Sequence, residues 1–237
     1  MFRCIDGRDR TRRRNGNDEP MNFSELKPQI ARERLVRNLR ARGITDERVL
    51  EAFRKVPRHR FIDTALQSQA YDDNALPIGC GQTISQPYVV ALMTELLGLK
   101  QDDKILEIGT GSGFQTAILA CFSRRVYTVE RNRDLAEAAR RKLRELGYVN
   151  VVCKVGDGSR GWPQHAPYDR IIVTAGAPAL PETLTAQLGD EGCMVIPRGD
   201  RASQQLEVYR KSGGTLTKEE AGQVVFVPLV GDQGWQE

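Results

Sequence analysis

Residues 104–119 read KILEIGTGSGFQTAIL, and this stretch decides the fold of the chain. The apolar residues on either side of Glu107 predict a strand that is covered on both faces. Three glycines follow the strand at alternate positions: Gly109, Gly111 and Gly113. Glycine permits a sharp turn and a close approach of the backbone to a ligand. A helix is expected from Ser112 or Phe114, and its unpaired amides would face that ligand. This order of elements is typical of a site for a nucleotide-like molecule.

Two residues of the stretch argue against a dinucleotide. The dinucleotide fingerprint needs its third glycine where this chain has Phe114, and the compressed spacing leaves less room for a pyrophosphate. Glu107 would repel a phosphate at the end of the strand, but its carboxylate could pair with an ammonium or sulfonium group. S-adenosylmethionine carries both cations. The stretch therefore favours a methyltransferase over a hydride-transfer enzyme.

Strand and helix patterns alternate beyond this stretch. The predicted strands are residues 105–108, 125–129, 151–155, 170–174 and 193–196, and the helices between them are residues 114–122, 135–146 and 180–188. Such alternation predicts an α/β fold with a doubly wound, mostly parallel sheet and helices on both faces. Two further strand candidates, 205–209 and 224–227, could be joined by a turn at Gly213 and Gly214. We expect them to form antiparallel C-terminal strands.

Helical patterns precede the sheet. The first ends at Gly43 and has apolar residues near helical spacing at Leu26, Ile30, Leu35 and Leu39. Thr45 is expected to cap a second helix, which Pro57 ends. Gln86 and Pro87 open a third helix. Residues 72–87, between the second and third helices, show neither a helical nor a strand period. Irregular backbone of this length is either functional or a plain connecting loop.

The chain fits one methyltransferase domain, residues 21–237, preceded by a basic tail. The domain would comprise N-terminal helices and a substrate loop (21–98), a cofactor-binding core (99–200) and C-terminal strands (201–237). Residues 1–20 have few apolar groups, so we expect a disordered, solvated tail; an arginine cluster that touches RNA or an acidic partner is the alternative. Met21 could be the natural start.

Charge and cysteine content exclude several classes of protein. The formal net charge is +4, and six arginines lie in the first fourteen residues, so the folded body is close to neutral and nucleic acid is not an expected partner. The five cysteines are widely spread without a CxxC spacing, which argues against a metal and against a disulfide framework. No apolar run approaches a membrane span. We expect a cytoplasmic, monomeric protein with no membrane partner.

Two more acidic residues follow strands at the same predicted sheet edge. Glu130 ends the second strand, where a carboxylate can accept hydrogen bonds from both ribose hydroxyls; the alternative is a surface residue that faces Arg131 or Arg133. Asp157 lies between Gly156 and Gly158 after the third strand. It could accept from an adenine amino group, or it could simply build a tight turn.

Ser85 precedes the third helix in the sequence TISQP. A serine at this position is most simply a helix N-cap, and nothing near it resembles a catalytic triad. The alternative is a role in the chemistry, because Ser85 lies in the irregular stretch just before a helix.

Five blocks of the chain resemble the bacterial protein-L-isoaspartate (D-aspartate) O-methyltransferase family, from about Leu26 to Gly231. They are VPRHRFID (56–63), ALPIGCGQTISQP (75–87), LEIGTGSGFQTAIL (106–119), GDG (156–158) and VPLVG (227–231). The second block is specific to this family, whereas the glycine motif marks only the larger class I of S-adenosylmethionine-dependent methyltransferases. Cys80 and Phe114 stand where relatives often differ.

The resemblance implies a protein repair enzyme. It would transfer the methyl group of S-adenosylmethionine to the free α-carboxylate of L-isoaspartyl or D-aspartyl residues in damaged proteins and peptides, and the ester would close to a succinimide that hydrolyses in part to normal aspartate. Ser85 would be the active-site serine. The implied substrate-binding residues are Ala75, Leu76, Pro77, Ile78, Thr83 and Ile84, and the implied cofactor-binding residues are Glu107, Gly109, Thr110, Gly111, Gly113, Glu130, Asp157 and Gly158.

Two rival functions stay open from the sequence. A methyltransferase acting on a small molecule or on RNA would share the cofactor residues but not the peptide-binding block. A binding module without turnover would hold the cofactor and methylate nothing. Methylation of an isoaspartyl peptide and of its aspartyl twin, measured side by side, separates the repair enzyme from another methyltransferase. Cofactor binding without methyl transfer to any damaged protein would indicate the binding module.

Overall fold

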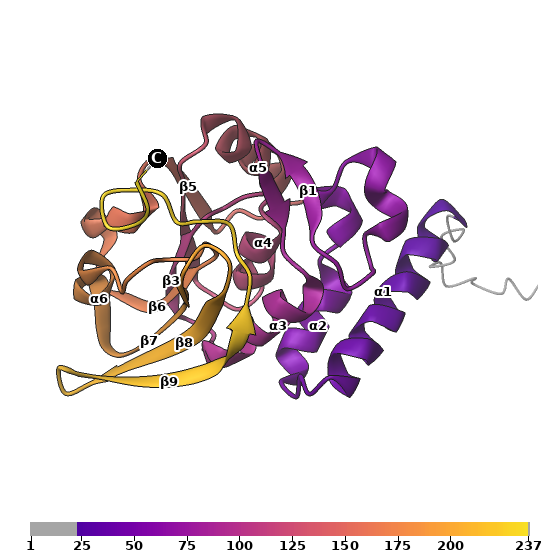
Figure 1. Cartoon of the computed structure of the whole chain (residues 1–237). Coiled ribbons are helices and arrows are strands. Elements are labelled where there is room, and N and C mark those ends of the chain that lie inside the picture. Colours follow the sequence, from indigo (N-terminus) through magenta and orange to yellow (C-terminus); the bar gives the residue numbers. More distant parts are fainter. Residues whose placement is uncertain (1–22, 237) are drawn as a thin grey trace, which may run out of the picture.

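A seven-stranded sheet forms the centre of this computed structural model, which describes residues 23–236 (Figure 1). The strand order is β5-β4-β3-β6-β7-β8-β9, and the strands are β3 (Lys104–Ile108), β4 (Arg125–Glu130), β5 (Val151–Val155), β6 (Tyr168–Val173), β7 (Leu188–Gly199), β8 (Gln204–Ser212) and β9 (Thr215–Val224). The pairs from β5 to β7 are parallel, and the pairs β7-β8 and β8-β9 are antiparallel. The predicted α/β fold class is confirmed. The basic tail predicted for residues 1–20 lies outside the described residues.

Helices cover both faces of the sheet (Figure 1). Ile105 of β3 packs in a cluster with α3 and α4, whereas its neighbour Leu106 packs in another cluster with α6, because successive side chains of a strand point to opposite faces. The helices are α1 (Phe23–Ala41), α2 (Glu47–Lys55), α3 (Pro87–Leu96), α4 (Phe114–Ala120), α5 (Arg133–Glu145) and α6 (Glu182–Gln187), and the short 3₁₀ helices are η1 (Arg58–Phe61), η2 (Thr64–Gln69), η3 (Gly158–Arg160) and η4 (Pro163–His165). No helix within residues 23–236 is long and apolar enough to span a membrane.

Phe114 joins the N-terminal helices to the sheet. Its ring is 1% exposed and lies edge-on to the rings of Phe53 and Phe61, each with a centroid distance of 5.7 Å. The buried guanidinium of Arg58 lies 5.2 Å from the same ring. A glycine at this position would leave a large cavity between α4 and the N-terminal helices. Packing therefore explains the departure of residue 114 from the dinucleotide pattern.

Two predictions about the N-terminal helices are wrong. The N-cap of α2 is Asp46, whose side chain accepts a hydrogen bond from the backbone N–H of Arg48. Thr45 lies directly before this N-cap, and its own N–H donates to Glu95 Oε1 on α3, at 2.7 Å. Ile30, which was assigned to the apolar face of α1, is 62% exposed, whereas Leu35 of the same helix is buried.

The stretch predicted as irregular, residues 72–87, contains a β-hairpin. Strands β1 (Leu76–Gly79) and β2 (Gln82–Ile84) pair in antiparallel fashion. The turn between them has positive φ at Gly79, Cys80 and Gly81. Strands of four and three residues are too short to show a period of two, so the sequence pattern missed them.

The C-terminal strands were predicted correctly in type but not in extent. The turn at Gly213 and Gly214 is confirmed, with φ of 55° and 78°. The prediction began the last strand at Val224, but strand β9 ends at that residue. The apolar pattern missed β9 because many of its residues are exposed Thr, Lys and Glu. Residues 225–230 continue beside the segment that follows β6: the N–H of Gly176 donates to Val227 O, and the N–H of Leu229 donates to Gly176 O.

Candidate active site

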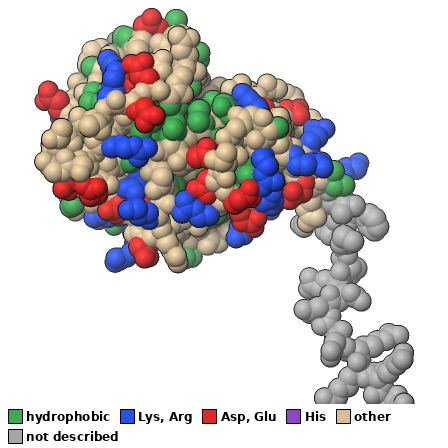
Figure 2. All heavy atoms as spheres, turned by 90° about the horizontal axis from the view of Figure 1, so that it is seen from below, with side chains coloured by type: hydrophobic (Ala, Val, Ile, Leu, Met, Phe, Trp, Pro, Cys, Tyr) green, Lys and Arg blue, Asp and Glu red, His purple; other side chains and the backbone are tan. Residues whose placement is uncertain are grey.

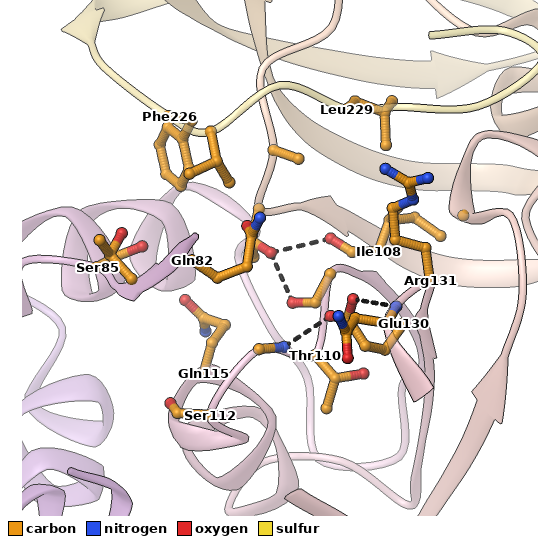
Figure 3. Close-up of a pocket in the computed structure, with 18 of the residues that line it drawn as sticks. Gln82, Ser85, Ile108, Thr110, Ser112, Gln115, Glu130, Arg131, Phe226 and Leu229 are labelled. Carbon is orange, nitrogen blue, oxygen red and sulfur yellow. Dashed lines mark hydrogen bonds between the residues drawn. The ribbon is translucent and has the colours of Figure 1, made fainter. Parts of the chain in front are cut away.

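A cavity of about 390 Å³ opens at the carboxyl ends of β3, β4 and β6 (Figure 3). Its walls come from the glycine loop after β3, the hairpin strand β2, the first turn of α4 and the C-terminal segment 226–230. Ligands of open parallel sheets bind outside the carboxyl ends of the strands. The volume lies in the range of about 300 to 1,000 Å³ that is typical of small-molecule sites. A cavity therefore lies at the sheet edge where the sequence predicted the site.

The glycine loop lies against both the sheet and the hairpin. Gly109 has φ of 95°, and a Cβ atom on it would collide with the hydroxyl of Thr174 at the end of β6. That hydroxyl lies 2.9 Å from Ile108 O and 2.7 Å from Gly109 O, so it ties the loop to β6. On the other side, Ile78 of the hairpin lies 3.5 Å from the position of a Cβ on Gly111. Glycine is required at 109 by both backbone conformation and space.

Glu130 lies in the cavity wall, not on the surface. Its side chain is nearly buried, with Oε2 accepting from the N–H of Gly111 and Oε1 from the N–H of Asn132, both at 2.9 Å. The alternative in which it faces Arg133 is not observed, since Arg133 pairs with Glu137. Each carboxylate oxygen has a further lone pair. Glu130 can therefore hold the glycine loop and still accept hydrogen bonds from a ligand.

Glu107 does not line the cavity. Its side chain is fully buried and points to α4, where Oε2 accepts from the hydroxyl of Thr116 at 2.5 Å and Oε1 has no hydrogen-bond partner. Desolvation by burial raises its pKa to about 8, and the nearby charge of Glu130 adds to the rise. The carboxyl group is consequently mostly protonated at neutral pH. This geometry departs from the predicted contact with a cationic ligand, because the alternation along β3 turns residue 107 away from the cavity.

Asp157 is half-buried and is not among the residues that line the cavity, although its neighbour Gly158 lines it. Oδ1 of Asp157 accepts from the N–H and the hydroxyl of Ser159, and Oδ2 accepts from the N–H of Asp232 at 2.9 Å. Burial alone would raise the pKa of Asp157, but these hydrogen bonds outweigh it and lower the pKa. The carboxylate caps η3 and ties it to the C-terminal segment. These contacts correspond to the alternative in which Asp157 builds a tight turn.

Ser85 lies in the cavity wall between β2 and α3 (Figure 3). The N-cap of α3 is Gln86, without a capping side-chain bond, so the simple capping role for Ser85 is not observed. Thr83 and Ile84 line the cavity beside it. The other strand of the hairpin does not: Ala75 and Pro77 are exposed, Leu76 is buried in the core and Ile78 contacts the loop. Gly113, the N-cap of α4, lies against α5 instead, with the position of a Cβ 3.4 Å from Ala139 and Leu143.

Several lining residues were missed by sequence reasoning. Thr174 and Ala175 follow β6 at the sheet edge, and the position of a strand end was an available signal for them. Ser112 and Gln115 lie in the helix start that the glycines announce. Residues 227–231 were noted as a block of the family resemblance but were given no site role, because only the tertiary fold brings the C-terminal segment 226–230 to this edge (Figure 3).

The cavity thus combines apolar walls with a carboxylate at one end and hydroxyl and amide groups at the other. Among residues 23–236, no group of three His, Cys, Asp or Glu side chains could hold a metal ion. A solved protein-L-isoaspartate O-methyltransferase has a TM-score of 0.78 with this structure at 32% identity, over 86% of this chain and 67% of the other. A Plasmodium falciparum chain solved in complex with S-adenosyl-L-homocysteine has a TM-score of 0.75 at 26% identity, over 84% and 98%. The fold and the site together define a methyltransferase of the doubly wound α/β class.

The sequence comparisons narrow this class to one family. The family model of protein-L-isoaspartate(D-aspartate) O-methyltransferase matches residues 30–234. The protein-L-isoaspartate O-methyltransferase of Trichlorobacter lovleyi is 58% identical over 209 residues, which cover 87% of this chain and 96% of that protein. The protein of the same name from Dictyoglomus turgidum is 52% identical over 215 residues, which cover 91% and 98%. The chain belongs to the protein-L-isoaspartate(D-aspartate) O-methyltransferase family.

Proposed function

We propose that the chain is a protein repair enzyme that methylates the free α-carboxylate of L-isoaspartyl and D-aspartyl residues, with S-adenosylmethionine as methyl donor. One observation carries the proposal. Ser85, from the block that is specific to this family, lines the same cavity as the glycine loop and Glu130. This shared cavity supports the proposal that a cofactor site and a peptide-binding hairpin meet at one place.

The lining residues fit the methyl donor, which supplies an activated methyl group when bound. Glu130 would accept hydrogen bonds from the ribose hydroxyls, and Gly109, Thr110 and Gly111 would let the backbone approach the ligand. Gly158 would border the adenine. In this arrangement, Glu107, Gly113 and Asp157 act indirectly, because they support the loop, α4 and η3 from behind the cavity.

The chain needs no general base for this reaction. An α-carboxylate titrates near a pH of about 3.5 and is already ionised at neutral pH. Ser85 would donate a hydrogen bond that orients the carboxylate, and the hairpin residues Thr83 and Ile84 would hold the peptide beside it. Orientation in a site that excludes water can contribute about 7 kcal/mol or more to the barrier reduction. The backbone amide nitrogen of the following residue can then attack the ester carbonyl and expel methanol, which closes the succinimide, and hydrolysis of the succinimide returns part of it to normal aspartate.

We further propose that the protein acts as a monomer in the cytoplasm, on protein and peptide substrates and not on nucleic acid. Figure 2 shows acidic and basic side chains interspersed on the face that it presents, without a basic stripe. Among the described residues, the large apolar side chains with high exposure lie on separate segments: Ile30, Val149 and Val225. The described cysteines are free, which suits a reducing compartment.

The test uses two matched peptides, one with an isoaspartyl linkage and one with a normal aspartyl linkage. We expect methyl transfer to the first and not to the second. Equal transfer to both, or transfer only to RNA or a small molecule, would refute the proposed substrate. Binding of S-adenosylhomocysteine without transfer to any isoaspartyl peptide would identify a binding module instead.

A further inference from the structure

Gln115 is a nearly buried polar residue in the first turn of α4 that no part of the proposed function uses. Its side chain is 8% exposed and lines the cavity between Ser85 and Ser112 (Figure 3). A buried amide in a binding cavity must direct its donors and its acceptor to definite partners. The orientation of this amide follows from the hydrogen bonds of its neighbour Thr94.

Thr94 fixes which end of the Gln115 amide faces the cavity. The Thr94 hydroxyl is buried and donates its single proton to Val90 O, at 2.7 Å. Toward Gln115 the same hydroxyl can therefore only accept, and Nε2 of Gln115 lies 3.0 Å from it. The NH₂ group of Gln115 consequently points to α3. Its carbonyl oxygen is the end of the amide that is left for the cavity that Gln115 lines, as a fixed acceptor.

A fixed acceptor selects a hydrogen-bond donor and repels carboxylates. At the opposite end of the cavity lies Glu130, the proposed partner of the ribose (Figure 3). If the ribose lies at Glu130 and the adenine at Gly158, as proposed above, an elongated ligand would extend its amino-acid end toward Gln115. The sequence suggested Glu107 as the partner of a cationic group of the ligand, but its carboxyl group is fully buried outside the cavity and accepts a hydrogen bond from Thr116. Gln115 is thus a polar acceptor that does face the cavity at that end.

We propose that the Gln115 carbonyl oxygen accepts a hydrogen bond from the α-ammonium group of S-adenosylmethionine, and that Thr94 is the positioning residue that orients it. This inference rests on the proposed function. The contact favours the ammonium over the carboxylate of the same ligand at this wall, so it also fixes which way the amino-acid end lies. The carboxylate is left to the hydroxyl and amide donors of the cavity.

The test is calorimetric binding of two ligands, S-adenosylhomocysteine and its analogue with hydrogen in place of the α-amino group. Gln115→Met keeps the side-chain length and removes the carbonyl. We expect its affinity for S-adenosylhomocysteine to fall about tenfold, as for the loss of one charge-assisted hydrogen bond, and its affinity for the desamino analogue to stay within about twofold of wild type. Thr94→Val should lower the ratio of the affinity for S-adenosylhomocysteine to the affinity for the desamino analogue, but by less than Gln115→Met, because the amide loses its fixed orientation.

Gln82→Met is the matched control, since Gln82 also lines the cavity but lacks a buried partner of this kind. It should leave the ratio of the two affinities unchanged. Equal losses for both ligands in Gln115→Met, no loss for either, or a changed ratio only in Gln82→Met would each overturn the inference. Thermal melts identify variants that fail to fold, in which case Thr94→Val carries the test. If the wild-type protein binds neither ligand, the proposed cofactor itself is wrong, which is a separate outcome.

Discussion

Glu107→Gln should change the pH dependence of stability. The folded protein holds the pKa of Glu107 at about 8, against an ordinary value of 4.5 that applies after unfolding. Between these values the folded state keeps the proton and the unfolded state releases it, so stability falls as pH rises. Each pH unit in this window changes the free energy of unfolding by about 1.4 kcal/mol. From pH 5.5 to pH 8 the wild-type protein should lose about 3 kcal/mol that the glutamine variant does not lose.

The measurement is urea denaturation of both proteins at several pH values, without ligand. The variant has its own penalty, because one buried NH₂ group lacks an acceptor, but this penalty does not depend on pH. Only the difference between the two proteins as a function of pH matters. A constant difference from pH 5.5 to pH 8 would show that Glu107 is ionised in the folded protein. In that case, the placement of its carboxyl group behind the cavity would be wrong.

Four further predictions follow from the site and the sequence. Ser85→Ala should lower turnover on an isoaspartyl peptide by about tenfold to a thousandfold with little change in melting temperature or cofactor affinity, since Ser85 is not a helix cap; normal turnover would remove it from catalysis. Glu130→Ala should weaken S-adenosylhomocysteine binding about tenfold or more in calorimetry and also destabilise the protein, because the amides of Gly111 and Asn132 lose their acceptor. Gly109→Ala should abolish cofactor binding and lower the melting temperature, because its Cβ collides with Thr174; unchanged binding would mean that the loop can shift freely. Deletion of residues 1–20 should leave activity and melting temperature nearly unchanged, since that segment has few apolar groups to bury, and a drop of several degrees would contradict it.

The sequence by itself determined the order of the elements and the location of the site. The apolar run around Glu107 and the glycines after it predict a buried strand, a tight turn and a helix. Each of these elements depends on the conformational preferences and hydrophobicity of neighbouring residues in the sequence. The alternation of strands and helices over residues 105–196 then limits the topology to a parallel sheet. Glu130 was placed at the cavity because the carboxyl ends of parallel strands meet at one edge.

Only the tertiary structure decided where individual side chains point. Glu107 and Asp157 follow the same strand-end pattern as Glu130, yet Glu107 is buried and accepts a hydrogen bond from Thr116 of α4, and Asp157 accepts from Ser159 and from the distant Asp232. The orientation of Gln115 depends on Thr94, which lies 21 positions away in sequence. Hydrogen-bond direction and burial are set by contacts between elements, so no local pattern records them.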